Sequence, residues 1–317
     1  MTPLEQHLAD YLHLRLSLGH ELREARWLLP SFVGYLQDLG LPTVTVEAAL
    51  AWAQYSPTGG GRSVAPRRMT AARGFARYLS GIHPSTEVPP LVLIPSWQRW
   101  RRPFIYTPTD IDAILAQAGS IVSPLRASTY QTLLGLLAAS GLRIGEAIKL
   151  DRSDIDWDQG VLLIRESKFG KSRLVPLHPS TMRALVEHAR LRDELQPRPK
   201  EASFFLSLTR KRLSYAVVSQ TFRKLVDARG VGAGALSPPR LHDLRHTFAV
   251  RTLLGWYRSD EDVQAKIPSL STYLGHREPA STYWYLSAAP ELLALAAARQ
   301  DTAWAAARPV TRSPVPS

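Results

Sequence analysis

The sequence predicts a mainly α-helical protein with one small antiparallel β-sheet in its second half. Apolar residues recur at helical spacing over long stretches of the chain, for example within residues 21–39. Residues 161–166 instead alternate between apolar and polar side chains, which is the period of a half-buried strand. The chain has 317 residues, 45% of them hydrophobic and 21% charged, as is usual for a globular protein with room for two domains.

The first hundred residues are predicted to form helices only. Helices are expected over residues 4–16, 21–39, 45–52 and 65–79. Thr45 is suited to cap the third of them, and the glycine-rich stretch at residues 57–61 separates it from the fourth. The fourth helix places arginines among apolar residues, and a basic face of this kind suits contact with DNA. The contacts expected here are Arg67, Arg68 and Arg73.

Proline accumulates between residues 83 and 107, and this density predicts an extended connector. Tryptophans and arginines are mixed into the same stretch, with Arg101 expected to contact DNA. These residues suit a strap lying along a phosphate backbone, or a surface linker that packs its tryptophans on its own domain. We expect domains over residues 1–95 and 108–300, joined by a linker at 96–107 and followed by a weakly ordered tail at 301–317.

The second domain is predicted to combine helices with the small sheet. A helix begins near Thr107 with proline in its first turn. Further helices are expected over residues 130–139, 181–193, 215–228, 242–254 and 290–298. Strands at residues 155–157, 161–166 and 173–177 would form the sheet. Lys168 and Lys171 lie in its turn, and only a turn is expected around residues 270–274.

Charge and composition restrict the partners and the kinds of site that the protein can have. Lys and Arg number 39 against 27 Asp and Glu, and the net charge of +12 suits a polyanionic partner, nucleic acid before an anionic membrane surface. Without cysteine there can be no disulfide, thiolate metal site or cysteine nucleophile. The first residues lack a secretory pattern, and no aliphatic stretch approaches the roughly 20 residues of a membrane span. We therefore expect a cytoplasmic protein.

Two arginine motifs carry chemistry suited to a phosphodiester. Arg143 precedes Glu146 by three residues, which places both on one helix face, where the carboxylate can orient the guanidinium. His242 and Arg245 repeat this spacing, and His246 is adjacent as a further hydrogen-bond partner. Because guanidinium groups match phosphate oxygens bidentately, the two arginines could stabilise the negative charge that gathers in a transition state.

A nucleophile and a proton donor are also present. Tyrosine can attack phosphorus and form a covalent intermediate, and spacing alone leaves open whether Tyr283 or Tyr285, which follow His276, would do so. Lysine or histidine can protonate the leaving oxygen, and the turn that holds Lys168 and Lys171 could reach it. The sequence offers no clear carboxylate cluster for a metal, so positioned cations would supply the electrostatic stabilisation.

Each of these motifs also has an ordinary structural interpretation. Arg143 and Glu146 could form a surface ion pair, and a His-x-x-Arg pattern is usually structural. Lysines at a hairpin turn are commonly solvated, and most tyrosines are core or surface aromatics. The joint occurrence of all the motifs, in this order, favours the catalytic interpretation.

The ordered motifs resemble those of the tyrosine recombinase (phage integrase) family over residues 107–298. Residues 140–146 match the family's first arginine motif, and Lys168 with residues 173–177 matches its hairpin lysine motif. The family's His-x-Leu-Arg-His and Leu-Gly-His boxes fall on residues 242–246 and 274–276. The family places its nucleophile nine residues after the last of these histidines, which selects Tyr285 over Tyr283. The first hundred residues resemble the family's helical core-binding domain, a SAM-like fold that precedes an α+β catalytic domain.

The resemblance implies a site-specific DNA recombinase that needs neither metal nor cofactor, acting in integration, transposition or resolution. The two arginines would hold the scissile phosphate, with hydrogen bonds from His242 and His276. Tyr285 would form a 3′-phosphotyrosine, while Lys168 protonates the departing 5′-hydroxyl. The implied partner is double-stranded DNA with specific recombination sites, bound by a homotetramer or a mixed tetramer of related recombinases, with no membrane involved.

The chain also departs from the simplest family pattern. Residues 256–271 form a longer stretch than in minimal members, as in transposon-encoded integrases, and Ser287 stands where many members place a histidine. Residues 290–299 could dock on a neighbouring protomer or on their own domain. Lys171 and Arg173 are expected to add DNA contacts. Relaxation of DNA by a type IB topoisomerase, or DNA binding by a catalytically idle accessory protein, are the alternative functions.

Overall fold

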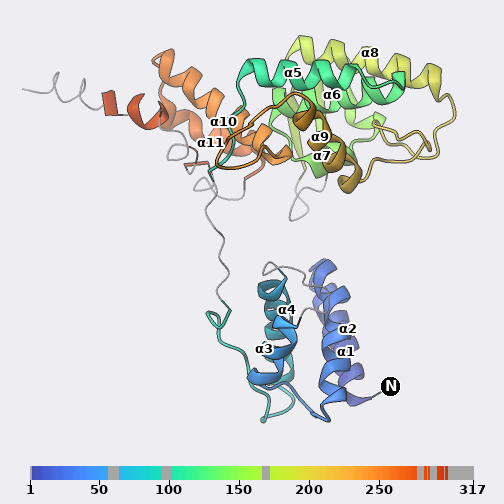
Figure 1. The fold of residues 1–317 in the computed structure, drawn as a ribbon, viewed down its shortest axis with the longest axis vertical. Coiled ribbons are helices and arrows are strands. Elements are labelled where there is room, and N and C mark those ends of the chain that lie inside the picture. The colour runs from blue at the N-terminus through green and yellow to red at the C-terminus, as the bar shows by residue number, and fades with distance from the viewer. Residues whose placement is uncertain are drawn as a thin grey trace, which may run out of the picture. The chain divides into compact units, whose positions relative to one another are not determined.

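The computed structural model describes residues 2–55, 64–94, 102–165, 172–276, 282, 283, 285, 291–295, 297 and 298. The chain divides into two compact units, residues 1–100 and 101–317 (Figure 1). This division falls within the stretch where the sequence predicts a linker. Arg101, Lys168 and Lys171 lie outside the described residues, so their expected roles stay predictions.

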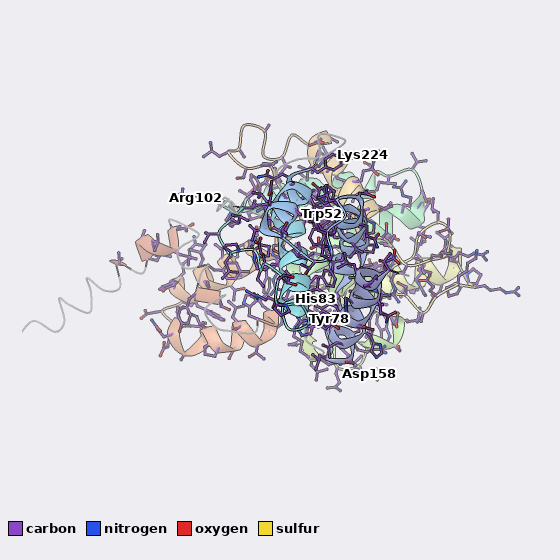
Figure 2. The ribbon with its side chains drawn as sticks, turned by 90° about the horizontal axis from the view of Figure 1, so that it is seen from below. Trp52, Tyr78, His83, Arg102, Asp158 and Lys224 are labelled. Atoms are coloured by element: carbon purple, nitrogen blue, oxygen red, sulfur yellow. The ribbon has the colours of Figure 1, made fainter. Side chains whose placement is uncertain are left out.

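The described residues of the first unit form the helices α1 (Pro3–Ser17), α2 (Arg23–Asp38), α3 (Val46–Gln54) and α4 (Ala65–Leu79). All of them lie within a few residues of the predicted ranges. Thr45 caps α3 as predicted, because its Oγ1 accepts a hydrogen bond from the backbone N–H of Ala48 at 3.2 Å. Aromatic side chains from α2, α3 and α4 are buried in the core, namely Phe32, Trp52 and Phe75. Figure 2 labels Trp52 among the side chains of this unit.

Arg73 of α4 has a structural role within this unit. Its side chain is buried, and it donates hydrogen bonds from Nε to the carbonyl of Pro89 at 2.8 Å and from Nη2 to that of Pro90 at 2.7 Å. These bonds hold the proline-rich stretch against the helix. A residue that contacts DNA needs an exposed side chain, and the sequence suggested such a contact for Arg73. In the structure the side chain of Arg73 is buried instead.

The other two arginines of α4 that were expected to contact DNA lie nearer the surface. Arg67 is exposed and forms an ion pair with Glu24 at 2.8 Å. Arg68 donates hydrogen bonds to the carbonyls of Trp52 and Tyr55, and its guanidinium lies 5.4 Å from the centre of the Trp52 ring. Only the exposed side chain of Arg67 keeps the setting expected of a phosphate contact.

The second unit is built from helices around a small sheet. Its helices are α5 (Pro108–Gly119), α6 (Pro124–Ser140), α7 (Ile144–Lys149), α8 (Pro179–Leu195), α9 (Tyr215–Ala228), α10 (Leu241–Arg258) and α11 (Val263–Leu274). A short 3-10 turn at Arg152–Asp154 leads into the sheet. None of the described helices is long and apolar enough to cross a membrane.

The sheet is antiparallel, as predicted, with strand order β1 (Ile155–Asp156), β2 (Val161–Ile164) and β3 (Arg173–Pro176). Leu162 of β2 lies opposite Val175 of β3, and both are buried. Ile164 pairs with Arg173 at one end of this ladder. This register points Arg173 and Val175 towards the protein, because alternate residues share a face of a strand.

Helix α6 is the centre of this unit and contacts α5, α8 and α10. Leu133, Leu134, Leu136 and Leu137 are all almost fully buried, whereas Gln131 and Ala139 are exposed, so the helix buries one wide apolar face. It ends at Gly141, whose φ of +61° is the left-handed conformation that glycine adopts without strain. The packing of α6 thus fixes the position of the chain where the first arginine motif begins.

The sequence prediction was wrong for α11, where only a turn was expected around residues 270–274. The structure has a helix of 12 residues with Pro268 inside it. Proline disfavours a helix interior because it lacks an N–H and clashes with the preceding turn. Here Val263, Ile267, Leu270 and Leu274 are buried at helical spacing, and this packing outweighs the local preference. The stretch at residues 256–271 is therefore the end of α10 and most of α11.

The described residues near the C-terminus pack on the same unit. Residues 291–295 are helical, and Leu292 is almost fully buried in an apolar cluster with Leu253 of α10 and Ile267 of α11. Arg258 forms an ion pair with Glu291. In this chain the segment therefore covers its own domain, which is one of the two placements that the sequence left open.

Replacing Gly141 by alanine should destabilise the second unit. A Cβ there would lie 2.5 Å from Cδ1 of Phe248, in addition to the strain of a left-handed conformation. We expect the free energy of unfolding to fall by about 2 kcal/mol. Gly145→Ala is the matched control, because a Cβ there meets no described atom within 4 Å and alanine favours its helix. Urea unfolding of both variants measures the difference, and equal stabilities would contradict this account.

Candidate active site

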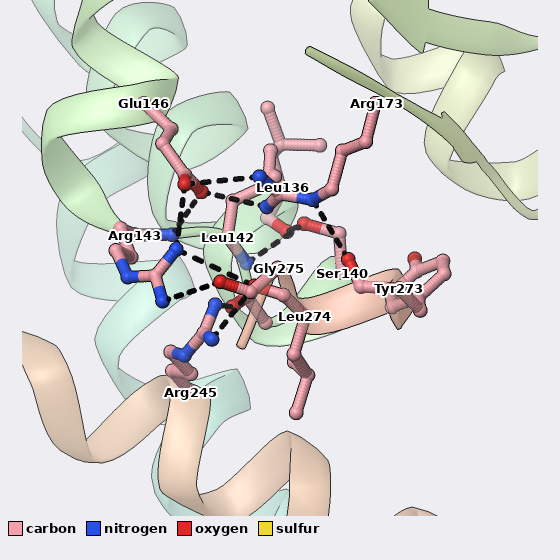
Figure 3. Close-up of polar contacts among 11 residues, drawn as sticks. Leu136, Ser140, Leu142, Arg143, Glu146, Arg173, Arg245, Tyr273, Leu274 and Gly275 are labelled. Carbon is pink, nitrogen blue, oxygen red and sulfur yellow. Dashed lines mark hydrogen bonds and ion pairs between the residues drawn. The ribbon is translucent and has the colours of Figure 1, made fainter. Parts of the chain in front are cut away.

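The carboxyl ends of α6 and α11 meet around Arg245, which lies in the second turn of α10 (Figure 3). Its guanidinium donates from Nη1 to the carbonyl of Gly141 at 2.8 Å and from Nη2 to that of Leu274 at 2.7 Å. Arg245 is only 2% exposed. A buried cation is stabilised here because the last carbonyls of a helix are unpaired and carry the negative end of its dipole.

Arg143 lies beside Arg245 and is more exposed. It immediately precedes α7, and its backbone N–H donates to Oε2 of Glu146 at 3.0 Å, which caps that helix. Its Nη1 donates to Oε1 of Glu146 at 2.8 Å, and its Nη2 donates to the carbonyl of Gly275 at 2.9 Å. The expected pairing of Arg143 with Glu146 is therefore present, with Arg143 at the helix boundary rather than inside the helix.

Glu146 also pairs with Arg173 of β3, which the sequence suggested as a DNA contact. Arg173 donates from Nη1 and Nη2 to the two oxygens of Glu146 at 3.0 and 2.8 Å, and from Nε to the carbonyl of Tyr273 at 2.9 Å. The side chains of the pair are 10% and 8% exposed. Arg173 therefore supports the site from inside the protein, because its guanidinium is directed at Glu146 and at the end of α11.

Two of the three motif histidines lie beside Tyr285, and the third lies against one of them. The rings of His242 and His246, one turn apart on α10, have centres 4.7 Å apart. The ring of Tyr285 lies 5.5 Å from that of His246 and 6.0 Å from that of His276, which it faces in parallel. Nδ1 of His276 lies 2.7 Å from Oγ1 of Thr282, a contact that the sequence analysis did not anticipate.

The two candidate nucleophiles differ in burial. Tyr285 is 2% exposed and belongs to the apolar cluster of α10 and α11, whereas Tyr283 is 42% exposed. Burial raises the pKa of the Tyr285 hydroxyl, and the charge of Arg245 and a hydrogen bond from it oppose that rise. The tyrosine beside the arginines is thus the one that the spacing of nine residues selected.

Burial and the nearby cations keep the histidines neutral. Burial, with the charge of Arg245, lowers the pKa of His276 to about 4 and also lowers that of His242. Burial and the neighbouring His242 lower the pKa of His246 to about 3. Arg245 itself has its pKa lowered to about 10 by burial and by Arg143, so it stays charged at neutral pH. The site combines charged guanidinium groups with uncharged imidazoles.

The structure brings together the residues expected to be catalytic, as far as it describes them. These are Arg143, His242, Arg245, His276 and Tyr285, together with Glu146 and His246, which were expected to support them. Lys168 lies outside the described residues, between β2 and β3 in the sequence. Among the described residues, no group of three or more Asp, Glu and His side chains could hold a metal ion.

Comparison with known proteins shows the family of the chain. The sequence profile of the phage integrase family matches residues 106–291, which include all the described residues of the site. The chain belongs to the phage integrase family. A protein of Sinorhizobium fredii named as an integrase/recombinase, y4rB, is 40% identical over 311 residues, covering 96% of this chain and 99% of the relative. Tyrosine recombinase XerD of Bifidobacterium longum is 29% identical and covers 72% of each chain.

Solved structures agree with this membership at the level of the fold. The Tn1549 transposon integrase in complex with transposon right end DNA superposes with a TM-score of 0.66 at 16% identity, covering 95% of this chain and 99% of that one. A lambda integrase tetramer bound to a Holliday junction gives a TM-score of 0.60 at 19% identity, covering 89% of this chain and 76% of that one. At such identities the likeness establishes the fold alone.

Replacing Arg173 by lysine should destabilise this integrase-family protein. Lysine keeps the charge but cannot reach both oxygens of Glu146 and the carbonyl of Tyr273. We expect the free energy of unfolding to fall by about 2 kcal/mol, the range of lost hydrogen bonds to charged groups. Arg190→Lys, at an exposed residue of α8, is the control and should change stability by less than about 0.5 kcal/mol. An equally small effect of Arg173→Lys would refute the supporting role.

Acidification should also destabilise the second unit. Burial lowers the pKa of both His276 and His188 to about 4, below the ordinary value of 6.5. Between these values the unfolded chain binds more protons, so stability falls as the pH falls from about 6.5 towards 4, and this contribution is constant above 6.5. In calorimetric scans the midpoint of His276→Gln should depend less on pH than the wild-type midpoint. Exposed His20→Gln should keep the wild-type slope, and a flat wild-type profile would count against the neutral histidines.

Proposed function

We propose that this protein is a site-specific DNA recombinase that cleaves and rejoins strands through a 3′-phosphotyrosine at Tyr285. The observation that supports the proposal is that two guanidinium groups and the neutral imidazoles of His246 and His276 lie beside one buried tyrosine. Guanidinium groups bind phosphate oxygens, and a tyrosine next to them has the charge environment that a developing phenolate requires. The enzyme activity and its assignment to these residues are inferences from family and geometry.

In the proposed reaction, Arg143 and Arg245 bind the non-bridging oxygens of the scissile phosphate. Each guanidinium has five N–H donors, and the carbonyl and carboxylate contacts use only part of them, so donors remain for the phosphate. His242 and His276, being neutral, can add hydrogen bonds without adding charge. The arginine charges favour the ionised form of Tyr285, which bonds to phosphorus as the bond to the 5′-oxygen breaks.

The departing 5′-oxygen needs a proton, which we assign to Lys168 from the family resemblance. Attack of a 5′-hydroxyl from a partner strand on the phosphotyrosine then restores a phosphodiester and releases Tyr285. The exchange keeps the number of phosphodiester bonds constant, so no energy source is required. In the same proposal the protein acts in the cytoplasm on double-stranded DNA with specific recombination sites, as a tetramer with copies of itself or related recombinases. The tetrameric lambda integrase on a Holliday junction supports this assembly.

Covalent trapping tests the proposal. A nicked duplex carrying the bound recombination site, identified by selection from random duplexes, should give a protein–DNA adduct on a denaturing gel in the presence of EDTA. Tyr285→Phe should abolish the adduct, because the attacking oxygen is lost, whereas Tyr283→Phe at the exposed neighbour should retain it. Loss of the adduct only in Tyr283→Phe would reassign the nucleophile. Tight binding without any wild-type adduct would favour the accessory-protein alternative.

A further inference from the structure

Thr282 lies in the site without a role in the family motifs that identified it. Its side chain is fully buried, and Oγ1 lies 2.7 Å from Nδ1 of His276. It precedes Tyr285 by three residues in a helical stretch, so it connects the histidine to the segment that carries the tyrosine. The His276 ring is held at a 21° angle to the ring of Tyr285. The hydroxyl is thus placed to set the orientation of the ring and the position of its proton.

A neutral imidazole carries one N–H, and the partner of one ring nitrogen decides which nitrogen bears the proton. Burial and the charges of Arg245 and Arg143 hold the pKa of His276 near 4, so at neutral pH the ring has this single proton. A threonine hydroxyl can donate or accept, and two arrangements are therefore available. In one, Thr282 donates to Nδ1 and the proton is on Nε2. In the other, Nδ1 donates to Thr282 and Nε2 has a lone pair.

The charge of the site chooses between these arrangements. An anion held by Arg143 and Arg245 would be repelled by a lone pair on Nε2 and would accept a hydrogen bond from an N–H there. No described residue makes a hydrogen bond with Nε2, so this nitrogen is left for a ligand. A carboxylate in place of the hydroxyl would favour a second proton on the ring. A hydroxyl orients the ring without adding charge.

We propose that Thr282 is a positioning residue that donates its hydroxyl proton to Nδ1 of His276 and thereby holds the proton of the imidazole on Nε2, as the donor to a phosphate oxygen. The inference rests on the proposed function for the identity of the ligand. The tautomer itself is a property of the protein without DNA and can be measured separately.

The first test is the protonation state of the two nitrogens of His276 by ¹⁵N NMR on histidine-labelled full-length protein at neutral pH, assigned with His276→Gln. In the wild type, Nδ1 should have the shift of an unprotonated nitrogen and Nε2 that of a protonated one. Thr282→Val, which has the same shape without the hydroxyl, should move both shifts towards a mixture of tautomers. Thr282→Ser should restore them. A protonated Nδ1 in the wild type, or a Val variant with unchanged shifts, would overturn the proposal.

The second test is the single-turnover rate of adduct formation with saturating nicked DNA. Thr282→Val should slow the reaction about tenfold, the lower range for loss of a partner that orients an active histidine, with little change in DNA affinity. Thr282→Ser should recover most of the rate. Thr252→Val is the control, because Oγ1 of Thr252 on α10 donates only to the carbonyl of Phe248. A rate loss that serine does not rescue would assign Thr282 to packing alone.

The two tests separate the two ideas. Absence of a wild-type adduct together with the expected tautomer would overturn the proposed recombinase activity and support the placement of the proton by Thr282. A wild-type adduct together with unchanged shifts in Thr282→Val would overturn the role of Thr282 and support the recombinase. Equal thermal midpoints of the valine and serine variants exclude misfolding as the cause of either result.

Discussion

The placement of the buried Arg245 between two helix ends is the interaction on which the site depends. Removing a guanidinium from water costs several kcal/mol of hydration free energy, and this cost is offset only if its N–H donors find acceptors in the protein. The carbonyls of Gly141 and Leu274 satisfy it, and both belong to helix termini whose acceptors would otherwise be unpaired. One side chain therefore donates hydrogen bonds to the terminal carbonyls of two helices, and it brings together segments more than a hundred residues apart in the sequence. His276 and the α7 start follow directly from these two ends, which is why they lie beside it.

The charge balance around this arginine favours an anionic ligand. Arg143, Arg173 and Arg245 meet here, and Glu146 is a carboxylate shared by the first two. Burial alone would raise the pKa of Glu146, but the hydrogen bonds and charge of Arg173 more than offset this and the pKa is lowered. The pair fixes two guanidinium groups without neutralising all of the positive charge. The neutral histidines add hydrogen-bonding capacity and no further repulsion.

The sequence predicted the elements whose pattern is local, and its motif spacing selected residues that lie close together in the structure. The small sheet and the four helices of the first unit follow from periodicity, and Tyr285 follows from its distance to His276. It did not predict α11, because Pro268 is a local signal and the buried apolar face that overrides it is tertiary. It also misplaced Arg73 and Arg173. Sequence shows that a residue is basic, but hydrogen bonds to backbone carbonyls, which decide burial, have no sequence signature. Thr282 was missed for the same reason, since one buried hydroxyl produces no pattern.

Backbone carbonyls accept hydrogen bonds from the three arginines of the site, and this has a consequence for how the site can vary. Arg245 donates to two backbone carbonyls, and Arg143 and Arg173 each donate to another. Every amino acid supplies a backbone carbonyl, so changes in the side chains that flank the site leave these acceptors in place. What must be kept is the path of the chain, which depends on the left-handed turns at Gly141 and Gly275. Related proteins could therefore diverge widely around a site of unchanged geometry, and an engineered specificity could be built on neighbouring positions without rebuilding the cluster of arginines.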